Sequence, residues 1–223
     1  MLAIFKREFK SYFQNVIGWL FVAALLAVYG LYFYVYNLKN GYPYISYDLN
    51  GIGFIMMIAV PILTMRSLSD EKKTKTDQLM LTSPVSVGRI VAGKYFAMAA
   101  VYTIVIALFA LSPLVLSIYG KVALSEAYVA LFGYWLYGLS CIAVGLFISS
   151  ISESVIISAI LTFTALFLSY MMQSITGLIS SSGNLLTKVL NCFDLYTPFE
   201  NFVSGCFSVT SAAYYVTVIL LLC

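Results

Sequence analysis

The sequence predicts an all-α protein that crosses a lipid bilayer several times. Of its 223 residues, 62% are hydrophobic and only 9% are charged, and the mean hydropathy is +0.97. A spanning helix needs about 20 apolar residues, because the hydrocarbon core is roughly 30 Å thick. Several segments meet that length, among them Tyr95 to Tyr119, which contains no charged residue. This composition excludes a soluble globular domain.

We expect a single transmembrane domain over residues 16–223 with six transmembrane helices, the last one short or truncated. A polar loop that contains Asp48 should separate the first two spans, and Pro61 should kink the second. The outward segment, 180–205, contains Cys192, and Cys206 follows directly after it; the two could form a disulfide or remain free thiols. The expected spans are about 16–36, 51–66, 95–119, 127–149, 155–179 and 206–223.

Residues 1–15 predict an N-terminal amphipathic helix that lies in the membrane interface. Aromatic and aliphatic residues recur there at helical spacing, with polar and basic residues between them. Such a helix would turn its aromatic face to the acyl chains and its basic face to anionic head groups. The alternative is an ordinary polar cap on the first span.

The placement of Lys and Arg predicts the orientation. One side of the expected topology carries nine of them and the other carries three. By the positive-inside rule, the N-terminus and the loop 67–94 are therefore cytoplasmic. The nine are Lys6, Arg7, Lys10, Arg66, Lys72, Lys73, Lys75, Arg89 and Lys94, and the three are Lys39, Lys121 and Lys188.

The residue types argue against a catalytic or metal-binding role for this chain. It has no histidine, which is the commonest general base and metal ligand, and its four cysteines lack a zinc-type spacing. It contains neither a GxxxxGK[ST] phosphate-binding loop nor an HExxH motif. We therefore predict no catalytic residue, no metal site and no nucleic-acid partner.

The polar residues inside the expected spans have two interpretations. The third to fifth spans contain no charged residue, which disfavours transport driven by an ion gradient. Uncharged polar side chains there could line a pathway or could form hydrogen bonds between helices. The possible pathway residues are Thr103, Ser112, Thr162, Ser169 and Gln173.

The stretch from Asp70 to Lys94 gathers much of the charge of the chain. The positive-inside rule explains a basic cytosolic connector. It does not explain why the apolar run from Leu79 to Leu81 stands at a polar surface, beside Thr82-Ser83-Pro84. An apolar contact with a polar rim is typical of a protein interface. The stretch therefore predicts a docking element for a partner.

At this stretch the sequence resembles the ABC-2 type permeases, which are membrane subunits of one class of ATP-binding cassette transporters. It is most similar to the gliding-motility and nitrous-oxide-reductase-maturation branch. Two further segments resemble that family, GLFISSISES (145–154) and DLYTPFENFVSG (194–205), whereas Lys75 and the short last span depart from its pattern. The matching residues in the loop are Glu71, Lys72, Lys73, Thr76, Leu79 to Leu81, Thr82 to Val85, and Lys94.

The resemblance implies a permease subunit of an exporter in a bacterial plasma membrane. Two such subunits, identical or different, would pair within the membrane lipid and bind two cytosolic ATPase subunits. ATP and magnesium would be bound by those partners, so that this chain needs no cofactor. A coupling helix between the second and third spans would dock on the ATPase through Glu71, Lys72, Lys73, Thr76, Asp77, Leu79, Met80, Leu81, Thr82, Ser83 and Pro84.

The resemblance also implies a second cytosolic contact, formed by Ser152 and Glu153 in the link between the fourth and fifth spans. The alternative function is that of a membrane scaffold or assembly protein. Such a protein would recruit a cytosolic partner through the loop 70–94 without moving a substrate.

Overall fold

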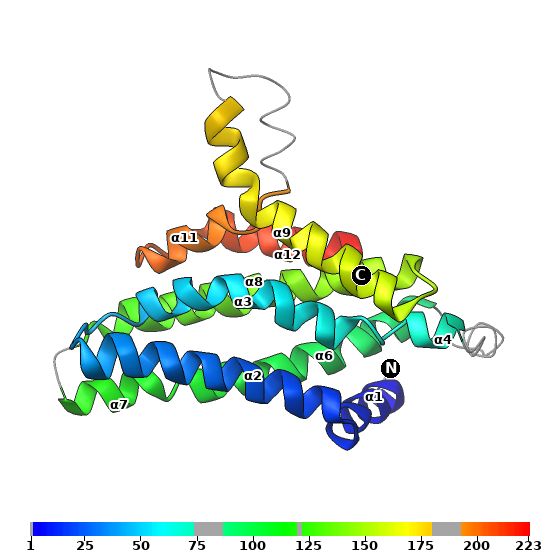
Figure 1. Ribbon diagram of the computed structural model, residues 1–223, viewed down its shortest axis with the longest axis horizontal. Helices are drawn as coiled ribbons and strands as arrows, with labels where there is room; N and C mark the ends of the chain where they lie inside the picture. Colours follow the sequence, from blue (N-terminus) through cyan, green and yellow to red (C-terminus); the bar gives the residue numbers. More distant parts are fainter. Residues whose placement is uncertain (1, 74–86, 120–121, 180–192) are drawn as a thin grey trace.

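The computed structural model describes residues 2–73, 87–119, 122–179 and 193–223, and the regular structure in these ranges is helical (Figure 1). One element, η1, is a π-helical continuation of the helix before it. The elements are α1 (Leu2–Gln14), α2 (Val16–Tyr32), η1 (Phe33–Lys39), α3 (Ile45–Thr64), α4 (Ser69–Lys73), α6 (Val87–Phe109), α7 (Ser112–Tyr119), α8 (Leu124–Ile151), α9 (Val155–Ile179), α11 (Thr197–Val203) and α12 (Val209–Leu222).

Five helical stretches in the described residues are long and apolar enough to cross a membrane. The expectation of a multi-pass all-helical protein is confirmed. The apolar helix α12 has 14 residues and is shorter than these five, so a sixth span remains a prediction. The five stretches are Val16–Lys39, Ile45–Lys72, Val87–Ile118, Leu124–Ile151 and Val155–Met172.

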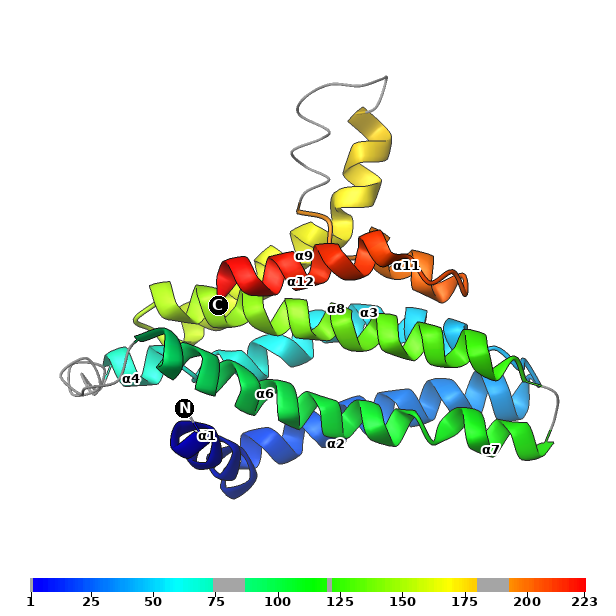
Figure 2. The same ribbon diagram turned by 180° about the vertical axis from the view of Figure 1, so that it is seen from behind.

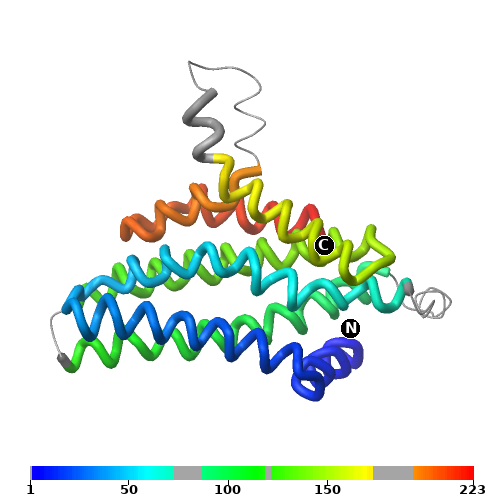
Figure 3. Tube along the Cα trace, in the orientation of Figure 1, coloured from blue at the N-terminus to red at the C-terminus, as the bar shows by residue number. Residues whose placement is uncertain are grey.

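The helices form three layers around α8 (Figures 1 and 2). Helices α3 and α8 lie in the middle layer, with α2, α6 and α7 on one side and α9, α11 and α12 on the other. Helix α8 packs against α3, α6, α9, α11 and α12. The chain turns sharply between α1 and α2, which sets α1 against the end of α6 (Figure 3).

Glycines on α8 allow its neighbours to approach closely. A Cβ atom on Gly138 would overlap the ring of Tyr102 in α6, and one on Gly145 would overlap the side chain of Thr64 in α3. The Tyr102 hydroxyl donates a 2.7 Å hydrogen bond to the carbonyl of Tyr134, which ties α6 to α8. Small residues at helix contacts are typical of packing in membranes, where dispersion contacts must hold helices together.

The second span begins earlier than the sequence predicted. Helix α3 begins at Ile45 rather than near residue 51, so Asp48, which we expected in a polar loop, lies inside the helix and is fully buried. Ile45, Leu49 and Ile52 recur at helical spacing and are also buried. Burial of these apolar side chains favours the longer helix. Asp48 is buried as well, because it lies between Ile45 and Leu49 on the same helix.

The third span also differs from its predicted bounds. Helix α6 begins at Val87 rather than at residue 95, and it ends at Phe109, before α7. Pro113 has no N–H with which to continue the hydrogen bonding to Phe109. The Ser112 hydroxyl donates to that carbonyl instead, at 2.7 Å. The early start of α6 places Lys94 inside the helix, where it is buried.

Candidate functional site

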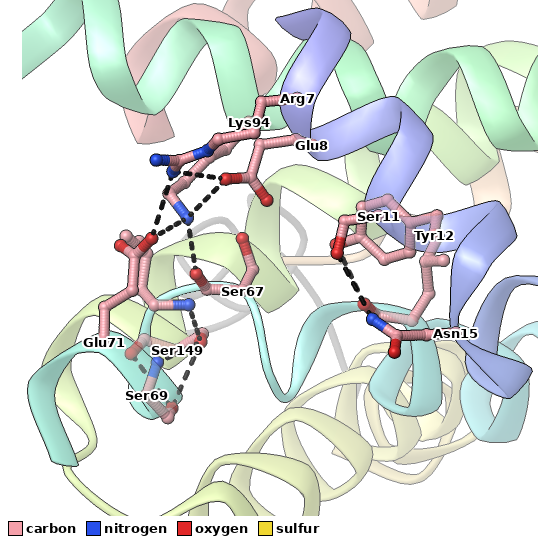
Figure 4. A network of polar contacts seen from close by, with 12 residues as sticks. Arg7, Glu8, Ser11, Tyr12, Asn15, Ser67, Ser69, Glu71, Lys94 and Ser149 are labelled. Atoms are coloured by element: carbon pink, nitrogen blue, oxygen red, sulfur yellow. Dashed lines mark hydrogen bonds and ion pairs between the residues drawn. The ribbon is translucent and has the colours of Figure 1, made fainter. Parts of the chain in front are cut away.

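Lys94 is a buried cation at the end of the bundle where α1 and α4 lie (Figure 4). Its side chain is 2% exposed. The Nζ atom donates to the carbonyl oxygen of Ser67 at 2.8 Å and to Oε1 of Glu71 at 2.7 Å, and Oε1 of Glu8 lies 3.6 Å away. A buried ammonium group must be paired and hydrogen-bonded, because the cost of removing it from water is high. These contacts provide that compensation.

Arg7 of α1 completes this group from its exposed side. Its Nη2 atom lies 2.8 Å from Oε1 of Glu8 and 3.8 Å from Oε1 of Glu71, and its side chain is 58% exposed. Two cations thus face two carboxylates, and their formal charges cancel. We call Arg7, Glu8, Glu71, Lys94 and the Ser67 carbonyl the lysine cluster. It joins α1, α4 and α6.

Tyr12 lies beside the lysine cluster on α1. Its hydroxyl donates to the carbonyl of Leu63 at 3.4 Å. Burial, and after it the charge of Glu8, raises the pKa of Tyr12, so the hydroxyl stays neutral at cellular pH. Together with Phe9 and Phe13, Tyr12 packs against the protein core. Part of the aromatic face that we expected to meet acyl chains therefore contacts protein, and the interfacial position of α1 remains a prediction.

A second set of contacts joins α8 to the turn before α4. The Ser149 hydroxyl accepts hydrogen bonds from the N–H groups of Leu68, at 3.2 Å, and Ser69, at 3.3 Å. The Ser69 hydroxyl donates to the Ser149 carbonyl at 3.2 Å (Figure 4). We call Leu68, Ser69 and Ser149 the serine joint. Its two serines are buried, and Leu68 and Ser69 lie between Ser67 and Glu71 of the lysine cluster in the chain.

The lysine cluster and the serine joint hold both flanks of residues 74–86. On the N-terminal side of residues 74–86, Ser69 and Glu71 of α4 are held by hydrogen bonds. On the C-terminal side, Lys94 of α6 is held by its bond to Glu71. Buried charge pairs break only at a large energetic cost, because each partner would be left unpaired away from water. Both flanks of residues 74–86 are therefore tied to neighbouring helices, to α1 and α6 through the lysine cluster and to α8 through the serine joint.

The predicted docking residues lie only partly within the described structure. Glu71 and Lys72 are described, and Lys73 is the last residue of α4. Glu71 bonds to Lys94 within the protein. The other predicted docking residues lie outside the described residues: Thr76, Asp77, Leu79, Met80, Leu81, Thr82, Ser83 and Pro84. Cys192, the possible partner of Cys206, also lies outside them.

The predicted second cytosolic contact lies in the tight turn between α8 and α9. Ser152 caps the end of α8 and is buried, and its hydroxyl donates to the carbonyl of Ser154 at 3.0 Å. Glu153 is exposed. The turn begins three residues after Ser149 in the chain, and it presents the side chain of Glu153 at the surface.

Two of the predicted pathway residues lie on α6 and α7 and are engaged in hydrogen bonds. Thr103 accepts a 3.0 Å hydrogen bond from Nε1 of Trp135 in α8. Ser112 is hydrogen-bonded to the hydroxyl of Tyr29 in α2. Both residues therefore connect neighbouring helices, and their role in a pathway stays a prediction.

The other predicted pathway residues lie on α9. Thr162 is buried and its hydroxyl donates to a carbonyl in the preceding turn of α9 at 2.8 Å. Ser169 donates to the carbonyl of Phe193 at 2.7 Å and accepts from the N–H of Leu195 at 3.0 Å. The side chain of Gln173 lies outside the described residues. Ser169 thus holds the segment before α11 against α9.

An apolar groove of about 680 Å³ lies between α8, α9 and α12. Its walls include Phe147, Leu168 and Leu221. The hydroxyls of Ser169 and Thr217 line it as well, but both donate to backbone carbonyls, and Thr217 does so at 2.7 Å. The groove therefore presents a hydrocarbon surface. Among the predicted pathway residues whose side chains the structure describes, Ser169 lines it.

The comparison with family models agrees with this architecture. A model for ABC-2 family transporter proteins matches residues 10–223, which include the five stretches that can span a membrane and both flanks of residues 74–86. No curated protein matches the chain. The match identifies a multi-pass membrane subunit of the permease type. The chain belongs to the ABC-2 transporter family.

Proposed function

We propose that this chain is the transmembrane subunit of an ATP-driven exporter and that a separate cytosolic ATPase docks on residues 74–86. Membership of the ABC-2 family supports the role of a permease subunit. The observation that supports coupling between the ATPase and the transmembrane helices is the lysine cluster. In it, Glu71 and Lys94 connect the two flanks of the docking segment, residues 74–86. ATP and magnesium belong to the partner in this proposal.

In the proposed orientation, the end of the bundle with α1 and α4 faces the cytoplasm of a bacterium. The basic residues of α1, Lys6, Arg7 and Lys10, lie at this end, together with Arg66 and Lys94. Lys and Arg are enriched in cytoplasmic segments near membrane spans. The turn between η1 and α3 then faces the opposite side.

The docking surface combines an apolar centre with a polar rim. Leu79, Met80 and Leu81 supply the centre, and Lys72 and Asp77 contribute to the rim. The exposed Glu153 in the turn between α8 and α9 supplies the second contact. The similarity of both segments to those of ABC-2 permeases supports this assignment.

The mechanism is a rigid-body movement. When the ATPase closes on ATP, it displaces the docking segment, and the buried contacts of Glu71 and Ser69 carry that displacement into α6 and α8. A second permease subunit, identical or different, completes the pathway within the lipid. The interior contacts of this chain hold its own helices together during the movement.

The docking proposal is tested by purifying the chain together with a candidate cytosolic ATPase subunit of the ATP-binding cassette type. We expect replacement of Leu79, Met80 and Leu81 by Asp to abolish both co-purification and the stimulation of ATP hydrolysis. The control is Tyr42→Asp, which changes an exposed residue in the turn between η1 and α3 and should affect neither. Survival of both properties in the triple variant would contradict the docking assignment.

A membrane scaffold that recruits the same ATPase is the alternative. A scaffold holds its partner without changing the hydrolytic rate, whereas a permease subunit alters that rate because closure of the ATPase must move the spans. Reconstitution of the wild-type complex in vesicles separates the two functions. An ATPase rate that is identical with and without the bound chain favours the scaffold.

A further inference from the structure

Asn37 and Asp48 form a second buried polar pair, at the end of the bundle opposite the lysine cluster. Asn37 lies on η1 and Asp48 lies in the first turn of α3, and the two elements are joined by the turn that contains Gly41. The side-chain amide of Asn37 donates to Oδ2 of Asp48. Asp48 is 0% exposed and Asn37 is 5% exposed. π-helical segments such as η1 occur frequently at functional sites.

The pair leaves two oxygen atoms without partners. Oδ1 of Asn37 and Oδ1 of Asp48 are buried and accept no hydrogen bond from protein. A buried polar atom without a partner is rare and costly. An ionised carboxylate can only accept hydrogen bonds and so cannot satisfy the amide oxygen, whereas a neutral carboxylic acid has one O–H donor.

One proton on Asp48 would satisfy both atoms. The acid O–H on Oδ1 would donate to Oδ1 of Asn37, while the Asn37 amide donates to Oδ2 of Asp48 as it does in the structure. The two groups then form a reciprocal acid–amide pair with two hydrogen bonds. The atoms that the structure leaves unpartnered are the same two that this second bond would join.

Within the part of the chain that the structure describes, no cation pairs with Asp48. Lys39, the basic residue of η1, is exposed. From α2, the Tyr29 hydroxyl faces the region and is bonded to Ser112. Helix α9 has no charged residue, and the acidic groups nearest this end on α8 and α11 are Glu126 and Glu200. An unpaired carboxylate buried in this setting is neutralised rather than ionised.

We propose that Asp48 and Asn37 form a proton-binding site, in which Asp48 is a neutral acid that donates its proton to the amide oxygen of Asn37. The site takes one proton from water when η1 packs on α3. It returns that proton to water when the two elements separate and Asp48 becomes hydrated. A bound metal ion would need several more oxygen ligands, and the described residues contain no group of three or more metal-ligating side chains.

Infrared spectroscopy of the full chain in lipid nanodiscs tests the proposal. The carbonyl stretch of a protonated carboxylic acid is separate from that of a carboxylate, and labelling with carboxyl-¹³C aspartate shifts it if it arises from Asp. We expect one label-sensitive acid band at neutral pH that disappears in Asp48→Asn. Absence of such a band in the wild-type protein at neutral pH would overturn the proposal, and this result requires no substitution.

Two variants assign the band. Asp194→Asn is the matched control, because both carboxylate oxygens of Asp194 already accept hydrogen bonds, from the N–H groups of Tyr196 and Thr197 and from the Thr197 hydroxyl. It should leave the band unchanged. Asn37→Leu should shift the band to the frequency of an acid that is not hydrogen-bonded. A band that survives in Asp48→Asn, or that disappears in Asp194→Asn, contradicts the assignment.

The pH dependence of thermal unfolding provides an independent readout. Folding takes up a proton at this site, because the unfolded chain exposes an ordinary, ionised Asp48 at neutral pH. Stability must therefore fall as the pH rises. We expect the melting temperature of the wild-type chain to fall relative to that of Asp48→Asn from about pH 4, near the ordinary pKa of Asp in the unfolded chain, up through neutral pH. Parallel curves for the two proteins would overturn the proposal.

Discussion

The two ends of the helical bundle bury polar groups in different ways. At one end, Lys94 and Arg7 face Glu8 and Glu71, so that formal charges cancel. At the other end, Asp48 is buried with the uncharged Asn37 and takes part in no ion pair among the described residues. The first arrangement allows ionised groups to remain inside the protein. The second requires the carboxyl group to be neutral.

The two polar clusters therefore suit different roles in the protein. The balanced lysine cluster joins three elements, which suits a mechanical link between a docking segment and the spans. The Asn37–Asp48 pair depends on one proton, which suits a contact that opens and closes.

Replacement of Lys94 by Met should have the largest effect on stability. It leaves the carboxylates of Glu8 and Glu71 partly buried and facing each other without the lysine. Breaking one side of a buried ion pair costs about 3–5 kcal/mol. Thermal unfolding of the purified chain in detergent measures the loss.

Two further variants control this experiment. Lys6→Met removes an exposed cation from α1 and should leave the unfolding temperature almost unchanged. The triple variant Lys94→Met, Glu8→Gln, Glu71→Gln removes all three charges and should recover much of the lost stability. If Lys94→Met unfolds at the wild-type temperature, the cluster does not stabilise this end of the bundle.

Replacement of Asn37 by Leu should have an intermediate effect. The neutral Asp48 loses its hydrogen-bond partner while it stays buried, at a cost of about 1–3 kcal/mol. Replacement of both Asn37 and Asp48 by Leu should be milder than Asn37→Leu alone, since no buried polar group remains. Asn40→Leu, at an exposed position, is the matched control. The same unfolding assay distinguishes these outcomes, and additive losses in the double variant would exclude a direct pair.

Replacement of Ser149 by Ala tests the serine joint. The N–H groups of Leu68 and Ser69 lose their acceptor, and the expected cost is about 1 kcal/mol. Ser150→Ala removes an exposed hydroxyl that bonds only within its own helix, and it should have a smaller effect. Amide exchange at Leu68 and Ser69 should increase in Ser149→Ala alone. Equal exchange in both variants would show that Ser149 does not hold this turn.

Replacement of Arg7 by Gln should have the smallest effect. Its side chain is mostly exposed, and solvent screens its contacts with Glu8 and Glu71. Exposed ion pairs contribute about 0–1 kcal/mol. Unfolding at low and high salt should show a small loss that vanishes as salt rises. A loss of stability as large as that of Lys94→Met would contradict this, because it would mean that Arg7 stabilises the lysine cluster as much as Lys94 does.

The fold was largely predictable because apolar length is a strong signal. The uncharged run that begins at Tyr95 and the apolar stretch after Val155 identified spans directly. Helix boundaries were harder, because charged residues were taken as boundary marks. Asp48 and Lys94 both lie inside helices instead. The recurrence of Ile45, Leu49 and Ile52 was the signal that could have shown the longer helix.

The candidate site was less predictable than the fold. The sequence pointed to residues 70–94 through their charge and the apolar run from Leu79 to Leu81. It did not show that Glu71 faces Lys94, because that contact depends on how α4 returns to α6. The contribution of Glu8 was hidden for the same reason, since it requires α1 to pack against α6. Contacts between distant segments require the tertiary structure.

The central claim is that the lysine cluster carries motion from the docked ATPase into the helices. It is tested most directly by hydrogen–deuterium exchange of the permease–ATPase complex, with and without ATP, in the wild type and in the triple variant Lys94→Met, Glu8→Gln, Glu71→Gln. We predict that ATP changes exchange in α1 and α6 of the wild type, the two helices that the lysine cluster joins to α4. In the triple variant the ATPase should still bind, but that change should be lost. An equal ATP-induced change in both complexes would contradict the account.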